Sequence, residues 1–110
     1  MIERHVSLVL LEGKQVQFEE FLREKYFPAM CLQPGFRGVS VLREQHEASR
    51  YKLVIRFEDA DSATAWRDSV AHRELSPKFK SFHSESGLMV YEVIQTVPEL
   101  SSPNTHTSVE

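Results

Sequence analysis

The chain has 110 residues, of which 41% are hydrophobic, 10% aromatic and 26% charged, and its formal net charge is -3. This composition indicates a globular protein of one domain and excludes a disordered chain, which would be poorer in aliphatic and aromatic residues. The slight acidic excess opposes nucleic-acid binding, because no surplus of lysine and arginine is available to neutralise phosphates.

The chain also lacks the patterns of membrane insertion and export. No apolar run approaches the roughly 20 residues of a membrane-spanning helix, and the N-terminus does not open like a secretory signal. The single cysteine, Cys31, cannot form an internal disulfide and is expected to be a small buried hydrophobe. We therefore expect a cytoplasmic protein without membrane contact.

The first predicted strand covers residues 2–11 and carries apolar side chains on both faces, which indicates that it is covered on two sides. After Gly13 the apolar residues follow the period of an amphipathic helix. This helix should kink or end near Phe27, because Pro28 lacks an amide hydrogen and crowds the preceding turn.

A turn at Pro34 and Gly35 precedes a second predicted strand over residues 37–45, and a third covers residues 50–57. The short polar link between these two strands favours an antiparallel hairpin. In the third strand one face is expected to hold the alternate apolar residues Tyr51, Leu53, Ile55 and Phe57.

The second half of the chain predicts two helices and a final strand. Capping residues and apolar spacing favour a helix over residues 62–73, and Ser76 followed by Pro77 is typical of the start of a second, short helix. The fourth strand is predicted over residues 88–96. We expect residues 98–110, which are mostly polar, to form a flexible tail after a domain of residues 2–97.

The predicted order of elements is βαββαβ, which is typical of the ferredoxin-like α+β fold, a four-stranded antiparallel sheet with its helices on one face. Because the other face of the sheet also carries apolar residues, we expect a homodimer in which two sheets meet face to face. A cavity for a small hydrophobic ligand is expected between the sheet and the helices of each subunit.

Two stretches of sequence suggest a family. The third strand, residues 51–57, is followed by a helix with Trp66, then Ser69 and His72, and Pro34-Gly35-Phe36 precedes the second strand. Over residues 2–96 the chain resembles antibiotic-biosynthesis-monooxygenase domains of the dimeric α+β barrel superfamily. The resemblance implies either a monooxygenase that oxidises anthrones or quinols without metal or flavin, or a haem-degrading relative.

The monooxygenase resemblance implies a substrate that supplies the electrons, a base that deprotonates it and an apolar pocket. His72 is the candidate base, because histidine titrates near pH ~6.5, and Trp66 is a candidate pocket wall. Each has a simpler interpretation: Trp66 as core packing, and His72 as a partner of the dipole at a helix C-terminus. Six helical positions rotate His72 by ~240° from Trp66, so the two were expected to border a cleft from adjacent sides.

Other candidate residues for substrate binding depend on weaker matches. Ser7 and Ser62 occupy positions where active relatives carry asparagine, and a serine has a different reach. Arg56 or Arg67 is expected to stabilise an anion. The remaining candidate is Tyr51 in the third strand. A basic group after the second helix can attract a carboxylated substrate or simply be a solvated face: Arg73, Lys78, Lys80 and His83.

The spacing of the histidines along the chain does not indicate a metal site or a haem ligand. The five histidines are scattered without the short spacing of zinc ligands, so no metal site is expected. Ser76 stands where haem-degrading relatives carry the axial histidine, which leaves His72 or His83 as possible substitutes. The predicted function is a cofactor-independent monooxygenase acting on a small aromatic or quinol-like compound. The alternatives are a non-catalytic ligand-binding or stress-associated dimeric barrel and a haem-binding protein.

Overall fold

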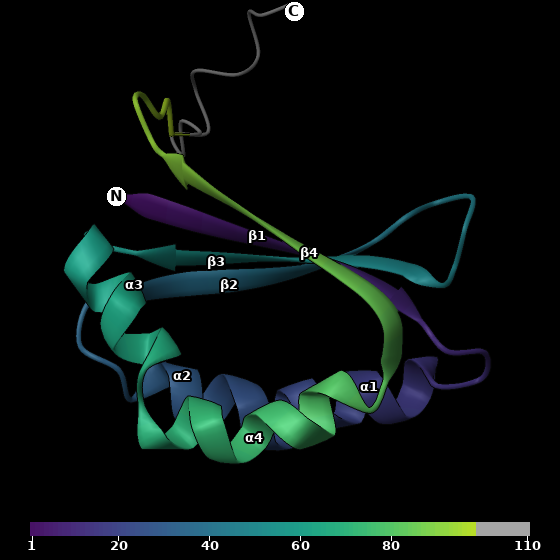
Figure 1. The fold of residues 1–110 in the computed structure, drawn as a ribbon. Coiled ribbons are helices and arrows are strands. Elements are labelled where there is room, and N and C mark those ends of the chain that lie inside the picture. Colours follow the sequence, from purple (N-terminus) through teal and green to yellow (C-terminus); the bar gives the residue numbers. More distant parts are fainter. Residues whose placement is uncertain (99–110) are drawn as a thin grey trace, which may run out of the picture.

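The computed structural model describes residues 1–98 (Figure 1). Four strands and five helical segments follow one another along the chain: β1 (Ile2–Leu10), α1 (Gln15–Phe21), the π-helical η1 (Leu22–Tyr26), α2 (Phe27–Cys31), β2 (Phe36–Arg43), β3 (Arg50–Phe57), α3 (Ala60–Arg67), α4 (Val70–Lys80) and β4 (His83–Glu92). Within residues 1–98, no helix has the length and apolar character needed to cross a membrane. Apart from Pro98, the tail predicted to be flexible lies outside the described residues.

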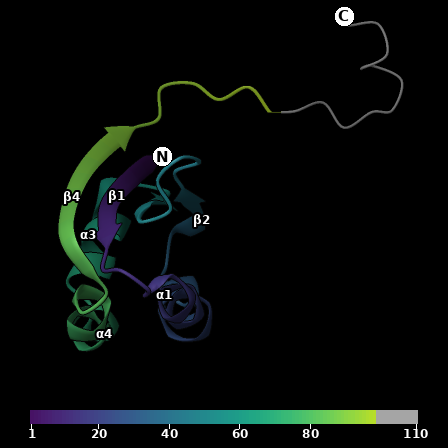
Figure 2. The same ribbon diagram turned by 90° about the vertical axis from the view of Figure 1, so that its right-hand side faces the viewer.

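The strands form one antiparallel sheet in the order β2-β3-β1-β4. All helices cover the same face of this sheet, which we call the inner face, and the opposite face is called the outer face (Figure 1). Figure 2 shows how β4, an edge strand, curves away from the end of α4 alongside β1. This arrangement confirms the predicted ferredoxin-like α+β fold.

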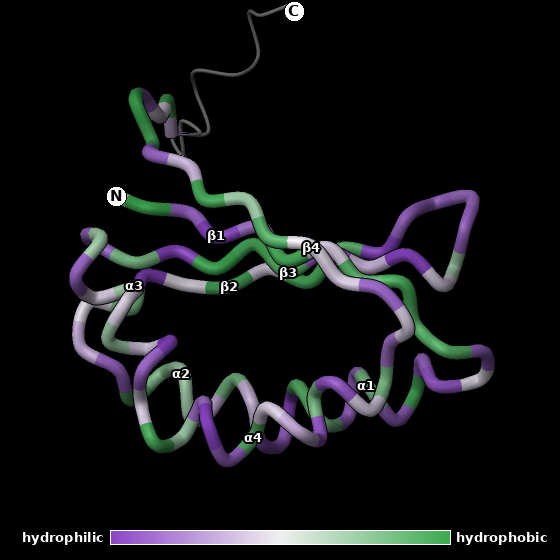
Figure 3. The backbone as a smooth tube through the Cα atoms, viewed as in Figure 1, coloured by the Kyte–Doolittle hydropathy of each residue, from purple (hydrophilic) through white to green (hydrophobic). Residues whose placement is uncertain are grey.

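The core lies between the inner face and the helices. The four alternate residues predicted to share one face of β3 are all buried there, and so are Leu8 and Leu10 of β1. Phe18 of α1 and Phe79 of α4 join the two helices, with ring centroids 5.8 Å apart. Figure 3 shows hydrophobic residues along the strands and the helices, whereas the β2–β3 connection is hydrophilic.

The first helical region does not end near Phe27 but continues beyond Pro28, which was one of the two predicted outcomes, and α1, η1 and α2 run on without a break to Cys31. Pro28 stands in the first turn of α2, where a missing N–H is tolerated. The wider turn of η1 precedes it, and the Phe27 N–H donates to the carbonyl of Leu22, five residues back. Cys31 ends this helix and is exposed, so the prediction that it is buried was wrong.

The second helical region breaks at a different place from the one predicted. Instead of one helix over residues 62–73, α3 ends at Arg67 and α4 begins at Val70. Ser69 has an extended backbone, and its Oγ accepts a hydrogen bond from the His72 N–H at 3.1 Å, which caps the new helix. Pro77, predicted to start a helix, lies inside α4.

The last strand starts and ends earlier than the predicted residues 88–96. Its polar first half is held in the sheet by pairing with β1, in which Leu10 lies opposite His83. At the other end Ile2 pairs with Glu92, and only Met1 remains beyond it, whose carbonyl accepts a hydrogen bond from the Val93 N–H at 2.8 Å. The length of β4 is therefore set by its neighbour.

Candidate functional site

A cavity of about 370 Å³ lies between the inner face of the sheet and the helices. Its volume falls near the lower end of the ~300–1,000 Å³ that is typical of small-molecule pockets. It is lined from β1, β3, β4, η1, α3 and α4, and the side chains that can bind or transfer protons are Arg4, Tyr26, Trp66, His72, Lys80 and His83.

Trp66 and His72 meet in this cavity. Their rings are in edge contact, with centroids 5.1 Å apart and planes at 87°. The break at Ser69 explains this contact, because the two residues stand on different helices and the rotation expected within one helix does not apply. Trp66 is 0% exposed and also packs on Tyr26, so it is at once a core residue and a wall of the cavity.

His72 lies in the first turn of α4, so the predicted interaction with a helix C-terminus was wrong. Burial lowers the pKa of His72, and the positive charges of Arg4, Lys80 and Arg67 lower it further, against a small opposing effect of Asp68. The positive end of the helix dipole acts in the same direction. The imidazole is therefore neutral at pH 7 and able to accept a proton.

Arg4 and Tyr26 also line the cavity, although neither was among the candidates from the sequence. The Nε atom of Arg4 is buried and has no hydrogen-bond partner among residues 1–98. Burial raises the pKa of Tyr26 to about 12, although the charge of Arg4 opposes this shift. One signal was available for Arg4, because it is a charged residue in the same alternating set as the inward-facing Leu8 and Leu10.

The far part of the cavity is bordered by His83, at the start of β4. Its Nε2 atom is buried and unpartnered within the described part of the chain, and its ring packs against Phe79 at 5.5 Å. Burial lowers the pKa of His83, and the charge of Lys80 adds to this effect. Lys80 and His83 thus line the cavity, whereas Arg73 and Lys78 of the predicted basic group do not.

None of the four candidate binding residues, Ser7, Tyr51, Arg56 and Ser62, lines this cavity. Ser7 and Tyr51 border a second hollow of about 520 Å³ near the β2–β3 connection, where the Tyr51 hydroxyl donates to Glu19. Ser62 lies in the first turn of α3 and touches Gly35, where a Cβ atom would come within 2.2 Å of the serine Oγ. We place the candidate active site in the first cavity because Trp66 and His72 meet only there.

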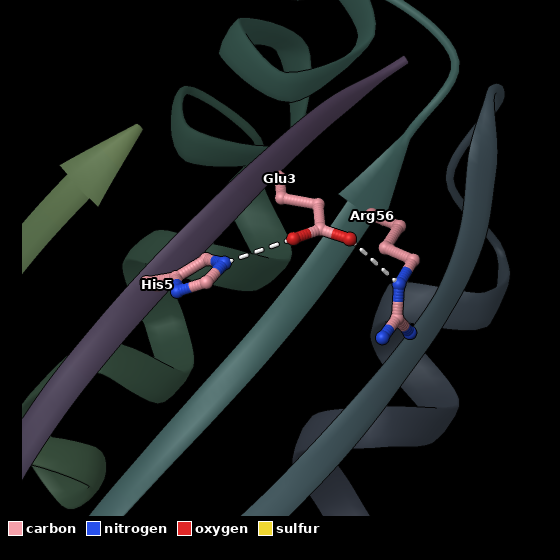
Figure 4. A network of polar contacts seen from close by, with 3 residues as sticks. All are labelled: Glu3, His5 and Arg56. Atoms are coloured by element: carbon pink, nitrogen blue, oxygen red, sulfur yellow. Dashed lines mark hydrogen bonds and ion pairs between the residues drawn. The ribbon is translucent and has the colours of Figure 1, made fainter. Parts of the chain in front are cut away.

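Arg56 lies on the outer face, in the network shown in Figure 4. Its Nε atom donates to Glu3 at 3.1 Å, and the other carboxylate oxygen of Glu3 is 2.9 Å from His5 Nε2. The hydrogen bond with His5 and the contact with Arg56 lower the pKa of Glu3, against the effect of burial. Arg56 is therefore paired with a carboxylate on the face opposite the cavity, and it cannot stabilise an anion there.

The outer face also presents apolar side chains to solvent, as the sequence predicted. Leu42 is 49% exposed, Met89 59% and Tyr91 44%. These residues come from β2 and β4, the two edge strands, and flank the network of Glu3, His5 and Arg56.

The residues of the cavity fit a haem group poorly. The cavity is small for a macrocycle, and the side chain at the expected axial position, Ser76, is not an iron ligand. Within residues 1–98, no three histidine, cysteine, aspartate or glutamate side chains come together in a group that could hold a metal ion.

The fold and this cavity define a ferredoxin-like α+β protein with an aromatic, basic pocket between its helices and its sheet. The family model of antibiotic biosynthesis monooxygenases matches residues 1–85, and the chain belongs to this family. The curated proteins yield no match to the chain.

Solved structures with the same fold come from several bacteria. Two that bear the family name, from Bordetella bronchiseptica and Deinococcus radiodurans, have TM-scores of 0.76 and 0.78 at 21% and 10% identity. These matches cover 86% and 92% of this chain and 97% and 100% of those chains. SnoaB, a cofactor-independent oxygenase from Streptomyces nogalater, matches with a TM-score of 0.75 and 19% identity, over 89% of this chain and 98% of its own. At these identities the similarity concerns the fold.

Proposed function

We propose that this protein is a cofactor-independent monooxygenase that oxidises a small aromatic or quinol-like compound with O₂. The observation that carries the proposal is the neutral imidazole of His72, held against Trp66 in a cavity large enough for a small ligand. Family membership supports the same class of reaction. SnoaB, which shares the fold, is a cofactor-independent oxygenase.

The proposed reaction begins with an activated CH₂ group, such as that of an anthrone. His72 takes one proton, and the electron pair left on carbon is delocalised over the ring as an enolate-like anion. This anion gives its electrons to O₂, and a C–O bond forms at the same carbon. The resulting peroxide anion recovers a proton from His72. Loss of the second C–H proton with cleavage of the O–O bond then leaves a C=O group and releases water, so that CH₂ and O₂ are converted to C=O and H₂O.

Trp66 and the buried aromatic residues around it have a supporting role in this scheme. Trp66, whose side chain is 0% exposed, supports the ring of His72 from behind the cavity, and Tyr26 keeps its proton because its pKa is raised to about 12. A low-polarity site of this kind limits water around the anion and strengthens its interactions with nearby donors.

Oxygen uptake with a panel of anthrones and quinols tests this proposal. The wild-type protein should consume one O₂ per substrate, and labelled O₂ should place one labelled atom in the product. His72→Gln should slow the reaction by about 10²–10⁴-fold, the usual contribution of a general base. His46→Gln, in the exposed β2–β3 connection, is the matched control and should keep the wild-type rate.

An unchanged rate in His72→Gln would contradict the role of this residue. A protein that binds members of the panel without any oxygen uptake would instead be the non-catalytic ligand-binding barrel that the sequence also allows. A Soret shift on adding haemin would favour the haem-binding alternative.

We further propose that the outer face forms a homodimer interface. The exposed Leu42, Met89 and Tyr91 make a patch that pairing with a second copy would cover. Three polar side chains near this patch, Glu3, His5 and Arg56, are already paired with one another, so burial of this network would leave few unsatisfied groups.

A further inference from the structure

We infer that Arg4 binds an anionic oxygen atom of the ligand, so that the compound accepted by the cavity is an aromatic acid. The acidic group is either a carboxylate or a phenol or enol that binds as its anion. This inference depends on the proposal that the cavity receives a ligand, but it does not depend on oxygenation.

The first observation is the isolation of Arg4. The other arginines of residues 1–98 are either exposed, as Arg23 and Arg73 are, or ion-paired, as are Arg37, Arg43, Arg50, Arg56 and Arg67. Arg4 is partly buried, and its Nε atom has no partner within the described residues. A buried donor without a partner costs free energy of folding, and such a cost is often met at a site that a ligand completes.

The second observation is the balance of charge around Arg4. The lining of the cavity, as far as residues 1–98 describe it, includes no aspartate or glutamate, whereas Lys80 adds a second positive charge. Tyr26, the acidic side chain near Arg4, stays protonated because burial raises its pKa to about 12. The protein therefore supplies no negative charge in the cavity, and the anion that would balance Arg4 must come from the ligand.

The position of Arg4 connects this anion with the proposed chemistry. Arg4 and His72 both line this cavity, and the charge of Arg4 is among the causes that lower the pKa of His72. An anionic oxygen beside Arg4 would thus lie near the proposed base. Arg4 would hold the enolate oxygen that forms when His72 removes a proton, the role first assigned to Arg56 or Arg67.

His83 provides a second open nitrogen at another point of the same cavity. It pairs with Leu10 in the sheet, whereas Arg4 lies opposite Val90, so the two residues stand apart along β4. An extended ligand, with its anion at Arg4, can place a second oxygen near His83 Nε2. This second contact involves no full charge and is expected to contribute less.

The test is equilibrium binding of three aromatic probes, monitored through the fluorescence of Trp66, which is the single tryptophan of the chain. The probes are naphthoate, its uncharged analogue naphthamide, and dinitrophenolate. The wild-type protein should bind at least one of the two anions more tightly than naphthamide. A preference for naphthoate identifies a carboxylate ligand, and a preference for dinitrophenolate identifies a phenolate or enolate.

Variants of Arg4 and His83 isolate the contributions of the two nitrogens. Arg4→Met should weaken binding of the preferred anion by about ten- to a hundredfold, the usual value of a charge-assisted hydrogen bond, and change naphthamide binding by less than about twofold. Arg4→Lys, which keeps the charge, should lose less than Arg4→Met. His83→Leu should weaken binding of dinitrophenolate, whose nitro groups supply further oxygens, by about two- to tenfold, and should change binding of naphthoate, which has no second oxygen group, by less than about twofold.

Arg37→Met is the matched control, because Arg37 is exposed and pairs with Glu58 away from the cavity. It should leave the binding of all three probes unchanged. Equal affinity of the wild-type protein for naphthoate, dinitrophenolate and naphthamide would overturn the inference, and so would an equal loss for anion and amide in Arg4→Met. Because the assay measures binding without O₂ consumption, its result can stand even if the oxygenase proposal fails.

Discussion

An arginine on the outer face of the sheet has a charged partner, whereas an arginine on the inner face has none among residues 1–98. Two adjacent residues of β1, Glu3 and Arg4, show this difference. Glu3 points to the outer face, where it accepts from Arg56 and contacts His5. Arg4 points to the inner face, where its Nε atom has no partner within residues 1–98. On the outer face every charge of the network is matched, whereas the inner face keeps an unmatched positive charge beside a cavity.

This difference distinguishes a surface suited to pairing from a site suited to a ligand. A surface that another copy covers must satisfy its own polar groups, because water will no longer reach them. A binding site gains affinity and specificity from donors that only the ligand satisfies. The outer face has the first property and the cavity has the second. Variants on the two faces should therefore respond differently.

The largest expected effect is on stability and comes from the wall of the cavity. Trp66→Ala should lower the free energy of unfolding by about 3–5 kcal/mol, because Trp66 is 0% exposed and its removal leaves a void in the core. Met89→Ala, on the outer face, should cost less than about 1 kcal/mol in the same urea titration at fixed protein concentration. Similar losses for both variants would mean that the outer face is as tightly packed as the core.

The second prediction concerns pairing of the outer faces. Met89→Glu places a charge in the apolar patch and should raise the dimer dissociation constant about thirtyfold, which corresponds to about 2 kcal/mol. Sedimentation equilibrium measures the change. Leu32→Glu is the control, because Leu32 is 84% exposed after α2, on the helical side of the sheet. A wild-type protein that stays monomeric at high concentration would contradict the proposed interface.

The third prediction compares the two arginines directly. Arg4→Met should raise the free energy of unfolding by about 1 kcal/mol, because the change removes a partly buried charge whose buried Nε atom has no partner among residues 1–98. Arg56→Met should lower it by about 1 kcal/mol, because Glu3 then loses one of its two partners. Chemical denaturation should therefore give shifts of opposite sign. A destabilised Arg4→Met would show that Arg4 is a structural residue.

The smallest expected effect is a dependence of stability on pH. The pKa values of His72 and His83 are lowered in the folded protein, mainly by burial. As pH falls below about 6.5, the unfolded chain therefore takes up protons before the folded protein does, and stability decreases. Above this range both states are neutral and the effect is absent.

His72→Gln should reduce this loss of stability between pH 7 and pH 5. The change should stay below the ~1.4 kcal/mol that one full unit of pKa shift would produce, because His72 is only half-buried. Denaturation of both proteins at the two pH values measures it. An identical pH dependence in wild type and variant would show that the pKa of His72 is not lowered.

Much of the fold could be predicted from the sequence, because alternation and helical period report directly on burial. The third strand was predicted at residues 50–57, where it lies, and its inward-facing residues were those found in the core. The order of elements and their resemblance to the family led to the correct fold. Local patterns were sufficient where side-chain burial determines the structure.

The predicted bounds of elements were wrong where backbone hydrogen bonds or contacts with distant segments determine where an element begins or ends. The start of β4 at His83 depends on pairing with Leu10, and polar residues in that half gave no sign of a strand. The break between α3 and α4 depends on the cap at Ser69, which competed with an apparently continuous helical pattern. The contact of Trp66 with His72 follows from that break, so the pair was correctly chosen but its geometry was not.

The binding residues were harder to predict than the catalytic candidates. Arg56 alternates with the inward-facing residues of β3, so its place on the outer face was available from the sequence, whereas its partner Glu3 lies 53 positions away. The residues around Arg4 also come from distant parts of the chain, so the sequence did not show that its Nε atom lacks a partner. Whether a charge is matched depends on which residues of other strands and helices surround it, and no local pattern contains that information.

The most direct test of the difference between the two faces is a crystal structure of the protein with naphthoate bound. We predict that the ring lies in the inner cavity beside His72 and that the carboxylate accepts a hydrogen bond from Arg4. Naphthoate found instead in the second hollow, beside Ser7 and Tyr51, with the inner cavity closed by protein side chains, would contradict the assignment of the inner face as the ligand site.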